Sequence, residues 1–582
     1  MTTYTAPTRD FLFVMEHLLD AGDVNIDLET LAAVLEEAGK LAAKVHSPTN
    51  RTADTDKPVL ARGQVRMPVG WGPMHRATAD GGWIGTSQNP DYGGQGLPVL
   101  VNSAVLEIFC GANMAFGLCM ALTEGVIETL EHVASDDLKQ RFIPKLISGE
   151  WTGTMNLTEP QAGSDLSTIR TKAWRDGGHY RISGQKSFIS FGDHDMSENI
   201  LHLVLARIEG APDGVKGISL FAVPKYLVGE DGSPGVCNEV TPVSLEHKLG
   251  LHGSPTAALS YGDDEGAIGY LLGAENRGLE YMFIMMNRER HMCGVQAIGV
   301  AEMAFQHALA YAGERVQGTP MGHSPGTPII GHPDVRRMLL TMKAYAEATR
   351  ALACQSAAMM DAGETNSHAQ AESEFLTPIV KAWSTDVGFE VASLGMQVFG
   401  GLGYMEETGA AQYMRDVRVT SIYEGTNGIQ ANDLVFRKVL RDGGATARRL
   451  LDRMSQYVND MDVSAEPVLK HLQSRLEIAL ADATSATESL IVAAEDEARY
   501  VAAVAVPYLK LMGIALGGFY MVKGVAVAQG ILDHGSGDEE FLRTKVSTGH
   551  FYVDHILCQT TGLTHTITQG ASVVASLKHE VY

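Results

Sequence analysis

The sequence predicts a multidomain α+β protein: a helical N-terminal region, a β-rich middle region, a helical bundle and a further helical region at the C-terminus. Three observations predict this fold class. Apolar residues recur at helical spacing in the first part of the chain, the period changes to that of strands near Thr152, and helical spacing returns near Asn276. The chain has 582 residues, 45% of them hydrophobic and 20% charged, which is sufficient for several folded domains.

Two amphipathic helices open the N-terminal region, which we place at residues 1–152. Residues three and four positions apart share one face of a helix, and apolar side chains follow this spacing twice. The positions are Phe11, Val14, Met15 and Leu18 in the first helix, and Leu28, Leu31, Leu35 and Ala38 in the second. The region is therefore expected to be mainly helical.

The middle region, residues 153–273, has the residue pattern of β-strands. Residues 200–208 and 218–223 are rich in Ile, Leu and Val, which favour strands. Turn-forming residues separate such runs, as in Asp176-Gly177-Gly178. We therefore expect an all-β domain in this region.

The third region, residues 274–442, is predicted to be a helical bundle. Small side chains at helical positions let neighbouring helices approach closely. These positions are Gly294, Ala297, Gly299, Ala301, Ala304 and Ala308. The Pro- and Gly-containing segment 319–327 interrupts the pattern and is predicted to be a loop.

The last region, residues 443–582, begins after a Gly-Gly pair and is predicted to be an additional helical domain. Its apolar residues again share one helix face, namely Leu469, Leu472, Leu476 and Leu480. The apolar run 511–522 is well short of the roughly 20 residues that span a bilayer. It therefore predicts a buried helix and no stable membrane insertion.

The composition and the missing motifs disfavour several classes of function. The chain carries 45 Lys and Arg against 69 Asp and Glu, and this net charge of −24 argues against a nucleic-acid partner. The six cysteines are dispersed and the N-terminus lacks a secretory pattern, so we expect reduced thiols and a cytoplasmic location. We find no complete P-loop, no G-x-G-x-x-G after a predicted strand and no H-E-x-x-H, and we predict no metal site.

Four segments hold residue combinations that point to a functional interpretation. They are residues 155–165, residues 182–190, residues 287–291, and the Gly-rich residues 397–404 together with 415–416 and 422–427. Phe188 and Ser190 share one face of the second segment, because residues two apart lie on the same side of a strand. Taken alone, the first three segments have ordinary interpretations as a turn, a strand and an ion-pair patch at the start of a helix. The glycines of the fourth segment permit close approach of a ligand to the backbone.

Together these segments resemble the acyl-CoA dehydrogenase family in their order and approximate spacing, from about Asp91 to Arg437. The resemblance implies an N-terminal helical domain, a middle β-barrel-like domain and a four-helix bundle. The segment 327–333 and the extra region 443–582 resemble a longer bacterial subgroup, which includes 3-(methylthio)propanoyl-CoA dehydrogenases. The resemblance thus accounts for all four predicted regions.

The resemblance also implies a reaction. In the family a carboxylate removes an α-proton from an acyl-CoA thioester while the β-hydrogen leaves as hydride to FAD. Glu424, in Tyr-Glu-Gly-Thr, matches this catalytic base. A minority of the family places the base on the bundle helix, at the position of Glu289, one residue before the arginine matched by Arg290. Because Glu424 lies in the complete motif, we expect it to be the base and Glu289 to form an ion pair.

The resemblance assigns the remaining site residues to FAD or to the substrate. The residues matched to FAD binding are Met155, Leu157, Thr158, Phe188, Ile189, Ser190, Arg315, Gln317, Gln397, Gly400, Gly401 and Thr426. The residues matched to contacts with acyl-CoA are Ser164, Asn287, Arg290 and Gly425. Phe188 and Ser190 stand where the family more often has Trp and Thr, so the aromatic face and the hydroxyl are retained.

Partners follow from the same resemblance. Arg315 and Gln317 match residues that reach the FAD of a neighbouring subunit, which implies a homodimer with shared FAD sites. The expected activity is oxidation of a short- or medium-chain acyl-CoA to the trans-2-enoyl-CoA, with electrons passed to an electron-transferring flavoprotein. Three alternatives stay open: a 3-(methylthio)propanoyl-CoA dehydrogenase specifically, an acyl-CoA oxidase that uses O₂, and a non-catalytic assembly or binding protein of the same fold.

Overall fold

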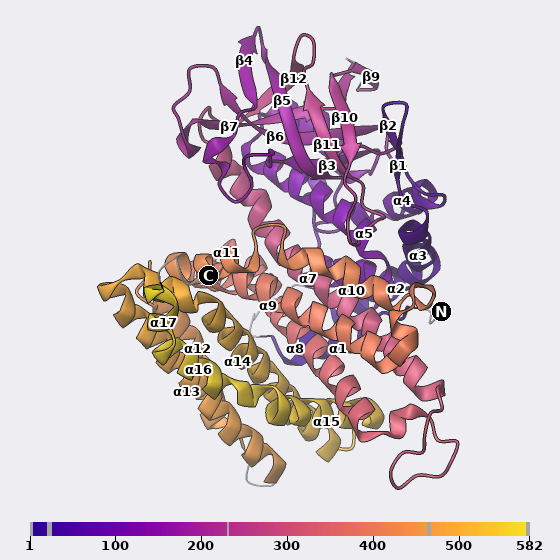
Figure 1. The fold of residues 1–582 in the computed structure, drawn as a ribbon, viewed down its shortest axis with the longest axis vertical. Coiled ribbons are helices and arrows are strands. Elements are labelled where there is room, and N and C mark those ends of the chain that lie inside the picture. The colour runs from indigo at the N-terminus through magenta and orange to yellow at the C-terminus, as the bar shows by residue number, and fades with distance from the viewer. Residues whose placement is uncertain (1–3, 20–25, 230–231, 463–466, 578–582) are drawn as a thin grey trace. The chain divides into compact units, whose positions relative to one another are not determined.

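A computed structural model describes residues 4–19, 26–229, 232–462 and 467–577 (Figure 1). Backbone contacts divide the chain into two compact units. The first comprises residues 1–36, 98–107 and 293–582, and the second comprises residues 37–97 and 108–292. Three helices contribute to both units: α2 (Leu28–Leu41), α5 (Val99–Val133) and α7 (Gly278–Glu314).

The predicted N-terminal helices are confirmed. Helix α1 (Thr8–His17) buries Phe11 and Val14, and α2 buries Leu31 and Leu35. The second unit also contains α3 (Ser47–Thr55), β1 (Val59–Ala61), β2 (Gln64–Arg66), α4 (Trp71–Asp80) and α6 (Asp136–Ile147). Helix α5 departs from helical geometry at Asn113, where φ is −157° and ψ is 90°, so it consists of two helical segments.

The middle region forms the expected β-structure. Its strands are β3 (Trp151–Asn156), β4 (Lys172–Asp176), β5 (His179–Ser190), β6 (Asn199–Ile208), β7 (Ile218–Pro224), β8 (Tyr226–Val228), β9 (Pro234–Cys237), β10 (Val240–Leu245), β11 (Thr256–Tyr261) and β12 (Ala267–Leu272). The main sheet has the order β10-β11-β5-β12-β7-β6-β3, and β4 pairs with both β5 and β6. The strands β5, β12, β7, β6 and β4 therefore close a small barrel (Figure 1). Ile182, Val204 and Phe221 are part of its buried core.

The first unit contains the helical bundle. Besides the later part of α7, its helices are α8 (Pro333–Gly363), α9 (Ser367–Phe399), α10 (Ala410–Val417) and α11 (Asn427–Asn432). Small residues join α7 to α9 as predicted: a Cβ added at Gly294 would lie 2.7 Å from the carbonyl oxygen of Val380. The predicted loop at 319–327 is confirmed, because no helix or strand lies between Glu314 and Ile329.

The extra C-terminal region is helical as predicted. It comprises α12 (Ala445–Asp460), α13 (Pro467–Asp496), α14 (Ala498–Asp533), α15 (Glu539–His555), α16 (Thr560–Gln569) and α17 (Ala571–Ser576). Helix α14 packs against α13, α15 and α16, and also against α8, α9 and α11 of the bundle. Gly513 and Gly517 permit the contact with α9, since a Cβ at either position would lie within 2.6 Å of Trp383.

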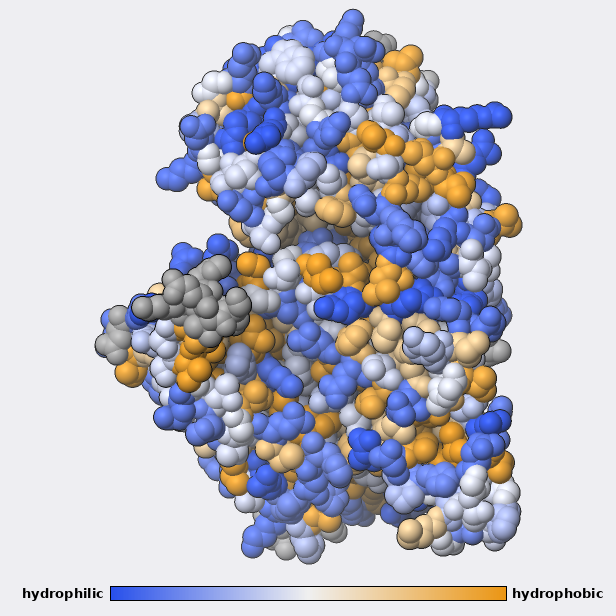
Figure 2. Space-filling model, viewed as in Figure 1, coloured by the Kyte–Doolittle hydropathy of each residue, from blue (hydrophilic) through white to orange (hydrophobic). Residues whose placement is uncertain are grey.

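Two of the described helices, α5 and α14, are long and apolar enough to cross a membrane by length and composition. Their most apolar windows are 100% and 89% buried, and the predicted buried run 511–522 lies in α14. Figure 2 shows mostly hydrophilic residues on the face in view, with smaller hydrophobic areas between them. These long apolar helices are thus core elements of the fold.

Candidate functional site

Two of the segments expected to contact FAD lie side by side in the second unit. Met155 is near the end of β3, and the carbonyl of Thr158 accepts a hydrogen bond of 2.9 Å from the backbone N–H of Ser187. Nζ of the buried Lys186 donates to the carbonyl of Leu157 at 3.0 Å. Residues 155–158 are therefore held against residues 186–190 at the end of β5, although the two segments are distant in the sequence.

A buried ion pair anchors this junction. Nζ of Lys186 lies 2.9 Å from Oε1 of Glu159, and the same oxygen accepts a hydrogen bond of 2.6 Å from the hydroxyl of Thr171. Burial lowers the pKa of Lys186 to about 8. Burial also opposes ionisation of Glu159, but the charge of Lys186 and the bond from Thr171 outweigh it and bring the pKa of Glu159 down to about 2. Both groups are therefore charged at neutral pH.

Phe188 has a backbone conformation that a bulky residue rarely adopts. Its φ is +59°, and its side chain is 63% exposed although it is a large apolar group. Strain of this kind is of order 1–3 kcal/mol and concentrates at functional sites. Ile189 beside it is buried and pairs with Ala257, and Ser190 pairs with Thr256 on β11. The strand thus presents the Phe188 ring on an accessible surface.

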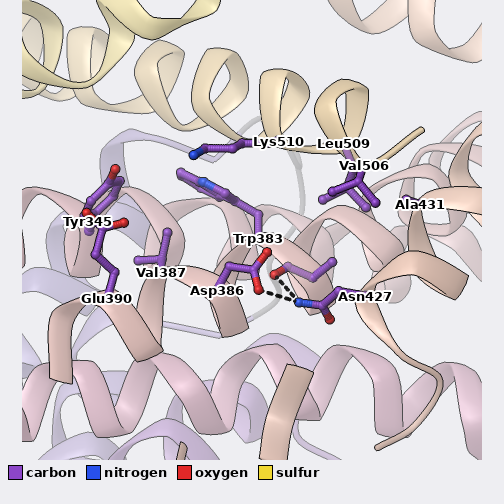
Figure 3. A pocket seen from close by; sticks show the side chains of 11 residues that line it. Tyr345, Trp383, Asp386, Val387, Glu390, Asn427, Ala431, Val506, Leu509 and Lys510 are labelled. Atoms are coloured by element: carbon purple, nitrogen blue, oxygen red, sulfur yellow. Dashed lines mark hydrogen bonds between the residues drawn. The ribbon is translucent and has the colours of Figure 1, made fainter. Parts of the chain in front are cut away.

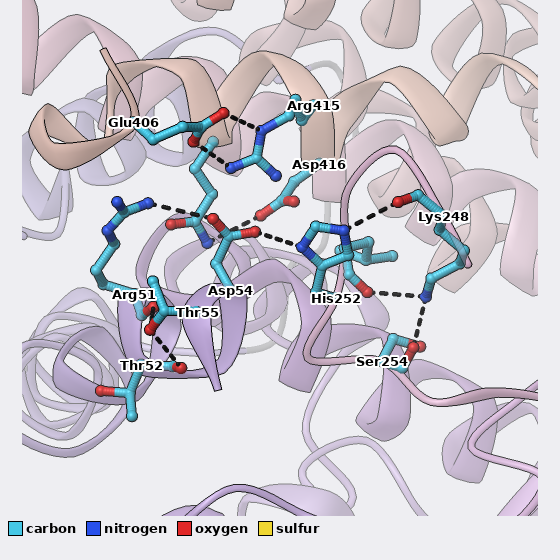
Figure 4. Close-up of polar contacts among 12 residues, drawn as sticks. Arg51, Thr52, Asp54, Thr55, Lys248, His252, Ser254, Glu406, Arg415 and Asp416 are labelled. Carbon is cyan, nitrogen blue, oxygen red and sulfur yellow. Dashed lines mark hydrogen bonds and ion pairs between the residues drawn. The ribbon is translucent and has the colours of Figure 1, made fainter. Parts of the chain in front are cut away.

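The segment that leads into β11 is fixed by polar contacts within the same unit (Figure 4). Nζ of Lys248 donates to the carbonyl of Ser254 at 2.5 Å and to the hydroxyl of Thr256 at 3.0 Å. Nδ1 of His252 lies 2.7 Å from Oδ1 of Asp54, whose other oxygen is 3.2 Å from Nη1 of Arg51. Through these contacts Thr256, the partner of Ser190 in the sheet, has a defined position.

The residues expected to contact acyl-CoA in the second unit lie on α7 and in a loop. Nη1 of Arg290 lies 3.4 Å from Oδ1 of Asn287, one helical turn away. Ser164 is exposed in the loop between β3 and β4. The alternative base, Glu289, is 1% exposed, and a Cβ at Gly125 of α5 would lie 3.1 Å from its Oε1. Glu289 is thus packed closely between helices.

In the first unit, Glu424 occupies a tight turn before α11. It follows the 3₁₀ turn Arg418–Ser421, and its φ is +56°, in the left-handed region that non-glycine residues avoid. Gly425 continues the turn with φ +81°. The hydroxyl of Thr426 caps α11 by accepting a hydrogen bond of 3.3 Å from the N–H of Ile429. Glu424 and Gly425 are both half-buried.

Three residues to which the sequence assigned no role hold this turn. Nζ of Lys381 donates to the carbonyl of Gly425 at 2.9 Å. Nε2 of Gln430 donates to the carbonyl of Glu424 at 3.0 Å. Asn427 accepts a second bond of 2.9 Å from Lys381. Asn427 ends the segment 422–427, and Gln430 lies six residues after Glu424. Lys381 lies 43 positions before Glu424, and no sequence signal connects it to the turn.

The remaining residues expected to bind FAD gather at one end of the bundle in the first unit. Arg315 and Gln317 follow α7 and are exposed, while their backbone carbonyls accept bonds of 2.7 Å from Ile329 N–H and 2.9 Å from His332 Nε2. Gln397 is exposed near the end of α9. The glycines Gly400 and Gly401 follow it in open space, since no atom lies within 4 Å of a Cβ added at either one.

A rigid polar contact holds the chain after this Gly-rich turn. Nη2 and Nε of Arg415 lie 2.7 Å and 3.1 Å from the two carboxylate oxygens of Glu406 (Figure 4). Such a bidentate pair fixes both orientation and distance. The pair links α10 to the turn Glu406–Thr408, which follows residues 400–404.

Family models cover most of the chain. The acyl-CoA dehydrogenase N-terminal domain matches residues 25–150, the middle domain matches 154–263 and the C-terminal domain matches 276–438. A fourth model, acetyl-CoA dehydrogenase C-terminal like, matches residues 450–578. The first three follow the order of the helical, β and bundle regions, and the fourth corresponds to helices α12–α17.

Individual relatives agree with these matches. The chain is 45% identical over 572 residues to 3-methylmercaptopropionyl-CoA dehydrogenase of Ruegeria pomeroyi, covering 96% of both chains. The fold is similar to that of Caenorhabditis elegans ACDH-11 in complex with C11-CoA, with TM-score 0.78 and 22% identity, covering 95% of this chain and 92% of that one. A Bacillus anthracis acyl-CoA dehydrogenase complexed with FAD gives TM-score 0.76 at 18% identity, covering 98% and 93%. The chain therefore belongs to the acyl-CoA dehydrogenase family, whose members are FAD-dependent oxidoreductases that act on acyl-CoA.

Proposed function

We propose that this enzyme oxidises a short- or medium-chain acyl-CoA to the trans-2-enoyl-CoA, with Glu424 as the catalytic base. The observation that carries the proposal is the Glu424 turn: a carboxylate in a strained left-handed conformation, with its own carbonyl and that of Gly425 held by two side chains. Strained residues at defined positions are typical of functional sites.

The residues present fit FAD. In the second unit, the exposed ring of Phe188 and the backbone of residues 155–158 offer an apolar face and polar groups to a flavin. In the first unit, the exposed Arg315 supplies a cation for a pyrophosphate, and the open surface at Gly400 and Gly401 admits close approach of a ligand to the backbone. When bound, FAD accepts a hydride from the β-carbon of the substrate.

The protein's own part in the reaction is binding and proton transfer. A carboxylate oxygen of Glu424 takes the α-proton, and it becomes a stronger base once the acyl chain excludes water from it. The backbone N–H of Glu424 donates to the thioester oxygen, where negative charge develops as the α-proton leaves. Arg290 and Asn287 support binding of CoA, to which the exposed Ser164 contributes from its loop.

We propose 3-(methylthio)propanoyl-CoA as the substrate to test first. The 45% identity over 96% of both chains to the Ruegeria pomeroyi 3-methylmercaptopropionyl-CoA dehydrogenase supports this choice. The electron acceptor is an electron-transferring flavoprotein in this proposal. The burial of the apolar windows of α5 and α14 supports a protein without stable membrane insertion. A cytoplasmic location is part of this proposal.

A homodimer with shared FAD sites completes the proposal. Arg315 and Gln317 extend into solvent from a fixed backbone, as expected of residues that reach a second copy. Exposed apolar side chains lie close to them and to the Gly-rich turn, namely Val316, Met321, Leu402, Tyr404 and Met405, with Tyr404 84% exposed. Such a group of apolar residues is suited to an interface between copies.

The decisive experiment records bleaching of the bound flavin under anaerobic conditions with a panel of acyl-CoAs. We expect short- and medium-chain thioesters, including 3-(methylthio)propanoyl-CoA, to bleach the flavin within seconds. Addition of an electron-transferring flavoprotein should then restore the oxidised spectrum. Rapid peroxide formation in air without that acceptor would identify an oxidase instead, and no bleaching by any thioester would contradict the proposal.

A further inference from the structure

A buried lysine on α9 is directed at the backbone that carries Glu424. Lys381 is 0% exposed, and its Nζ donates both to the carbonyl of Gly425 and to Oδ1 of Asn427, each at 2.9 Å. Burying an ammonium group is costly unless it is hydrogen-bonded. Both of these acceptors belong to the turn that follows Glu424, so the lysine ties this turn to the bundle.

Asn427 extends the connection along α9. Its Nδ2 donates to Oδ1 of Asp386 at 2.8 Å and to the carbonyl of Ala382 at 3.1 Å. The hydroxyl of Thr385 lies 3.0 Å from the same nitrogen. One amide therefore contacts three polar groups over about one helical turn, as Figure 3 shows for Asp386.

Helix α14 of the C-terminal domain lies next to Asp386 and Asn427. Asp386 and Asn427 line a pocket together with Val506, Leu509 and Lys510 of α14 (Figure 3). Helix α14 also packs against α11, which begins at Asn427. Burial raises the pKa of Asp386. The extra domain thus adds an apolar wall next to the helix that supports the catalytic turn.

We infer that Lys381 and Asn427 are positioning residues for Glu424, and that α9 acts through them to keep the base in its left-handed conformation. The left-handed conformation of Glu424 is unfavourable by itself, and the bonds from Lys381 and Gln430 fix the carbonyls of Gly425 and of Glu424 itself. Misplacing a reacting group by about 1 Å costs on the order of 100-fold in rate. This inference rests on the proposed role of Glu424.

The test is the Lys381→Met variant, which keeps the length of the side chain but removes its charge and its donors. We expect the rate of flavin reduction by acyl-CoA to fall by about 10- to 100-fold with a small change in KM. With α-deuterated substrate, the isotope effect on this rate should increase, because proton removal becomes more limiting. Lys381→Arg should restore part of the rate, and Asn427→Ala is the second variant if Lys381→Met folds poorly.

Lys545→Met is the matched control. Lys545 is another buried lysine of the same unit, paired with Glu347 at 3.1 Å, and it lies on α15. Its loss should lower thermal stability but leave the isotope effect unchanged. If Lys381→Met and Asn427→Ala both bleach the flavin at the wild-type rate, the inference is wrong while the proposed function stands. If wild-type protein shows no bleaching, or Glu424→Gln reacts normally, the proposed function itself fails.

A separate side-chain cluster on the C-terminal domain has the chemistry of a metal site. Nε2 of His471 on α13 lies 2.7 Å from Oδ1 of Asp554, and Nε2 of His550 lies 3.2 Å from the other oxygen of Asp554, both on α15. A ligand atom from each of the three residues lies within 4.8 Å of the other two. His550 and Asp554 are four residues apart, so they share one face of α15.

We propose that these three residues bind a divalent transition-metal ion such as Zn²⁺, which would join α13 to α15. Two imidazoles and one carboxylate form a ligand set that suits Zn²⁺, Ni²⁺ and Co²⁺. The ligand atoms already lie within 4.8 Å of one another. All three side chains are partly exposed, which gives the ion a direct path from solvent.

Calorimetric titration of the holoenzyme with Zn²⁺ at pH 7.5 tests this site. We expect one ion per chain and a rise in the melting temperature, with affinity weakened at least about tenfold in His471→Ala. His565→Ala, which removes an exposed histidine on α16, is the control and should bind as the wild type does. Equal binding by wild type and His471→Ala, or no binding at all, would overturn the proposal.

Discussion

The ring of Tyr311 on α7 stacks on the ring of Phe399 at the end of α9, with centroids 4.1 Å apart and an angle of 15° between the planes. Arg315 follows four residues after the first ring, and Gly400 follows directly after the second. An aromatic pair of this kind is worth about 1 kcal/mol beyond the area that it buries. The stack therefore fixes two chain segments, distant in sequence, that are both predicted to bind the FAD pyrophosphate.

Arg315→Ala is expected to lower the affinity for FAD by at least about tenfold, because a charge-assisted bond to phosphate is lost. The amount of flavin retained after gel filtration, compared at equal protein concentration, measures this effect. Arg337→Ala is the control, since Arg337 is exposed on α8 and pairs with Asp334 at 2.9 Å. Equal flavin retention in both variants would show that Arg315 does not contact the cofactor.

Glu424→Gln should reduce turnover by more than about 1,000-fold, because the amide cannot accept the α-proton. Glu289→Gln should retain turnover within about tenfold, although some stability is lost because Glu289 is buried. Stopped-flow measurement of flavin bleaching in both variants separates the two carboxylates. The opposite result would place the base on α7.

Lys186→Met should destabilise the middle domain by about 3 kcal/mol, because Glu159 would stay buried without its cation. We also expect faster loss of FAD, since Lys186 holds the carbonyl of Leu157 in the segment next to Phe188. Lys172→Met is the control, because Lys172 is exposed on β4. It should change the free energy of unfolding by less than about 0.5 kcal/mol. Urea unfolding followed by flavin fluorescence reports both properties.

His202 makes stability depend on pH in the acidic range. Burial lowers its pKa from 6.5 to about 3, and its Nδ1 lies 2.7 Å from the hydroxyl of Thr154. The unfolded chain therefore binds one more proton than the folded chain between these two pH values. The contribution of the neutral His202 to the free energy of unfolding is fully present above pH 6.5. It is lost as the pH falls toward 3, at about 1 kcal/mol per pH unit.

His202→Gln should reduce the slope of unfolding free energy against pH by that amount between about pH 4 and pH 6. Urea titrations at four pH values in this range measure the slope. His323→Gln, at an exposed position in the loop after α7, should leave it unchanged. An unaltered slope in His202→Gln would show that this imidazole is protonated in the folded protein.

Periodicity predicted the elements of the fold well. The leucines at 469, 472, 476 and 480 are all buried on α13, and the change of period near Thr152 coincides with the start of β3 at Trp151. These successes have a common cause: both patterns are local consequences of burying one face of an element. Residue patterns do not predict the closure of the barrel through β4, since closure depends on which strands pair.

The site was predictable only where a motif is contiguous. The Tyr-Glu-Gly-Thr segment points to Glu424, and this residue lies in a distinct left-handed turn. The supporting contacts join residues far apart in the chain, such as Lys381 with Gly425 and His471 with Asp554. No spacing rule connects such pairs, because the fold brings them together. The positive φ of Phe188 could not be predicted from the sequence either, since Phe favours ordinary strand geometry.

The left-handed backbone at Glu424 lowers the stability of the fold, whereas the proposed reaction requires the carboxylate at this position. In a library that contains all twenty residues at this position, selection for thermal stability alone should enrich Gly and also Asn. We expect Gly to raise the free energy of unfolding by up to about 1 kcal/mol relative to Glu. Selection for turnover should retain only Glu. A lineage that lost its catalytic role would therefore drift toward Gly or Asn at this site, and the residue found there would record whether the enzyme is still under selection for activity.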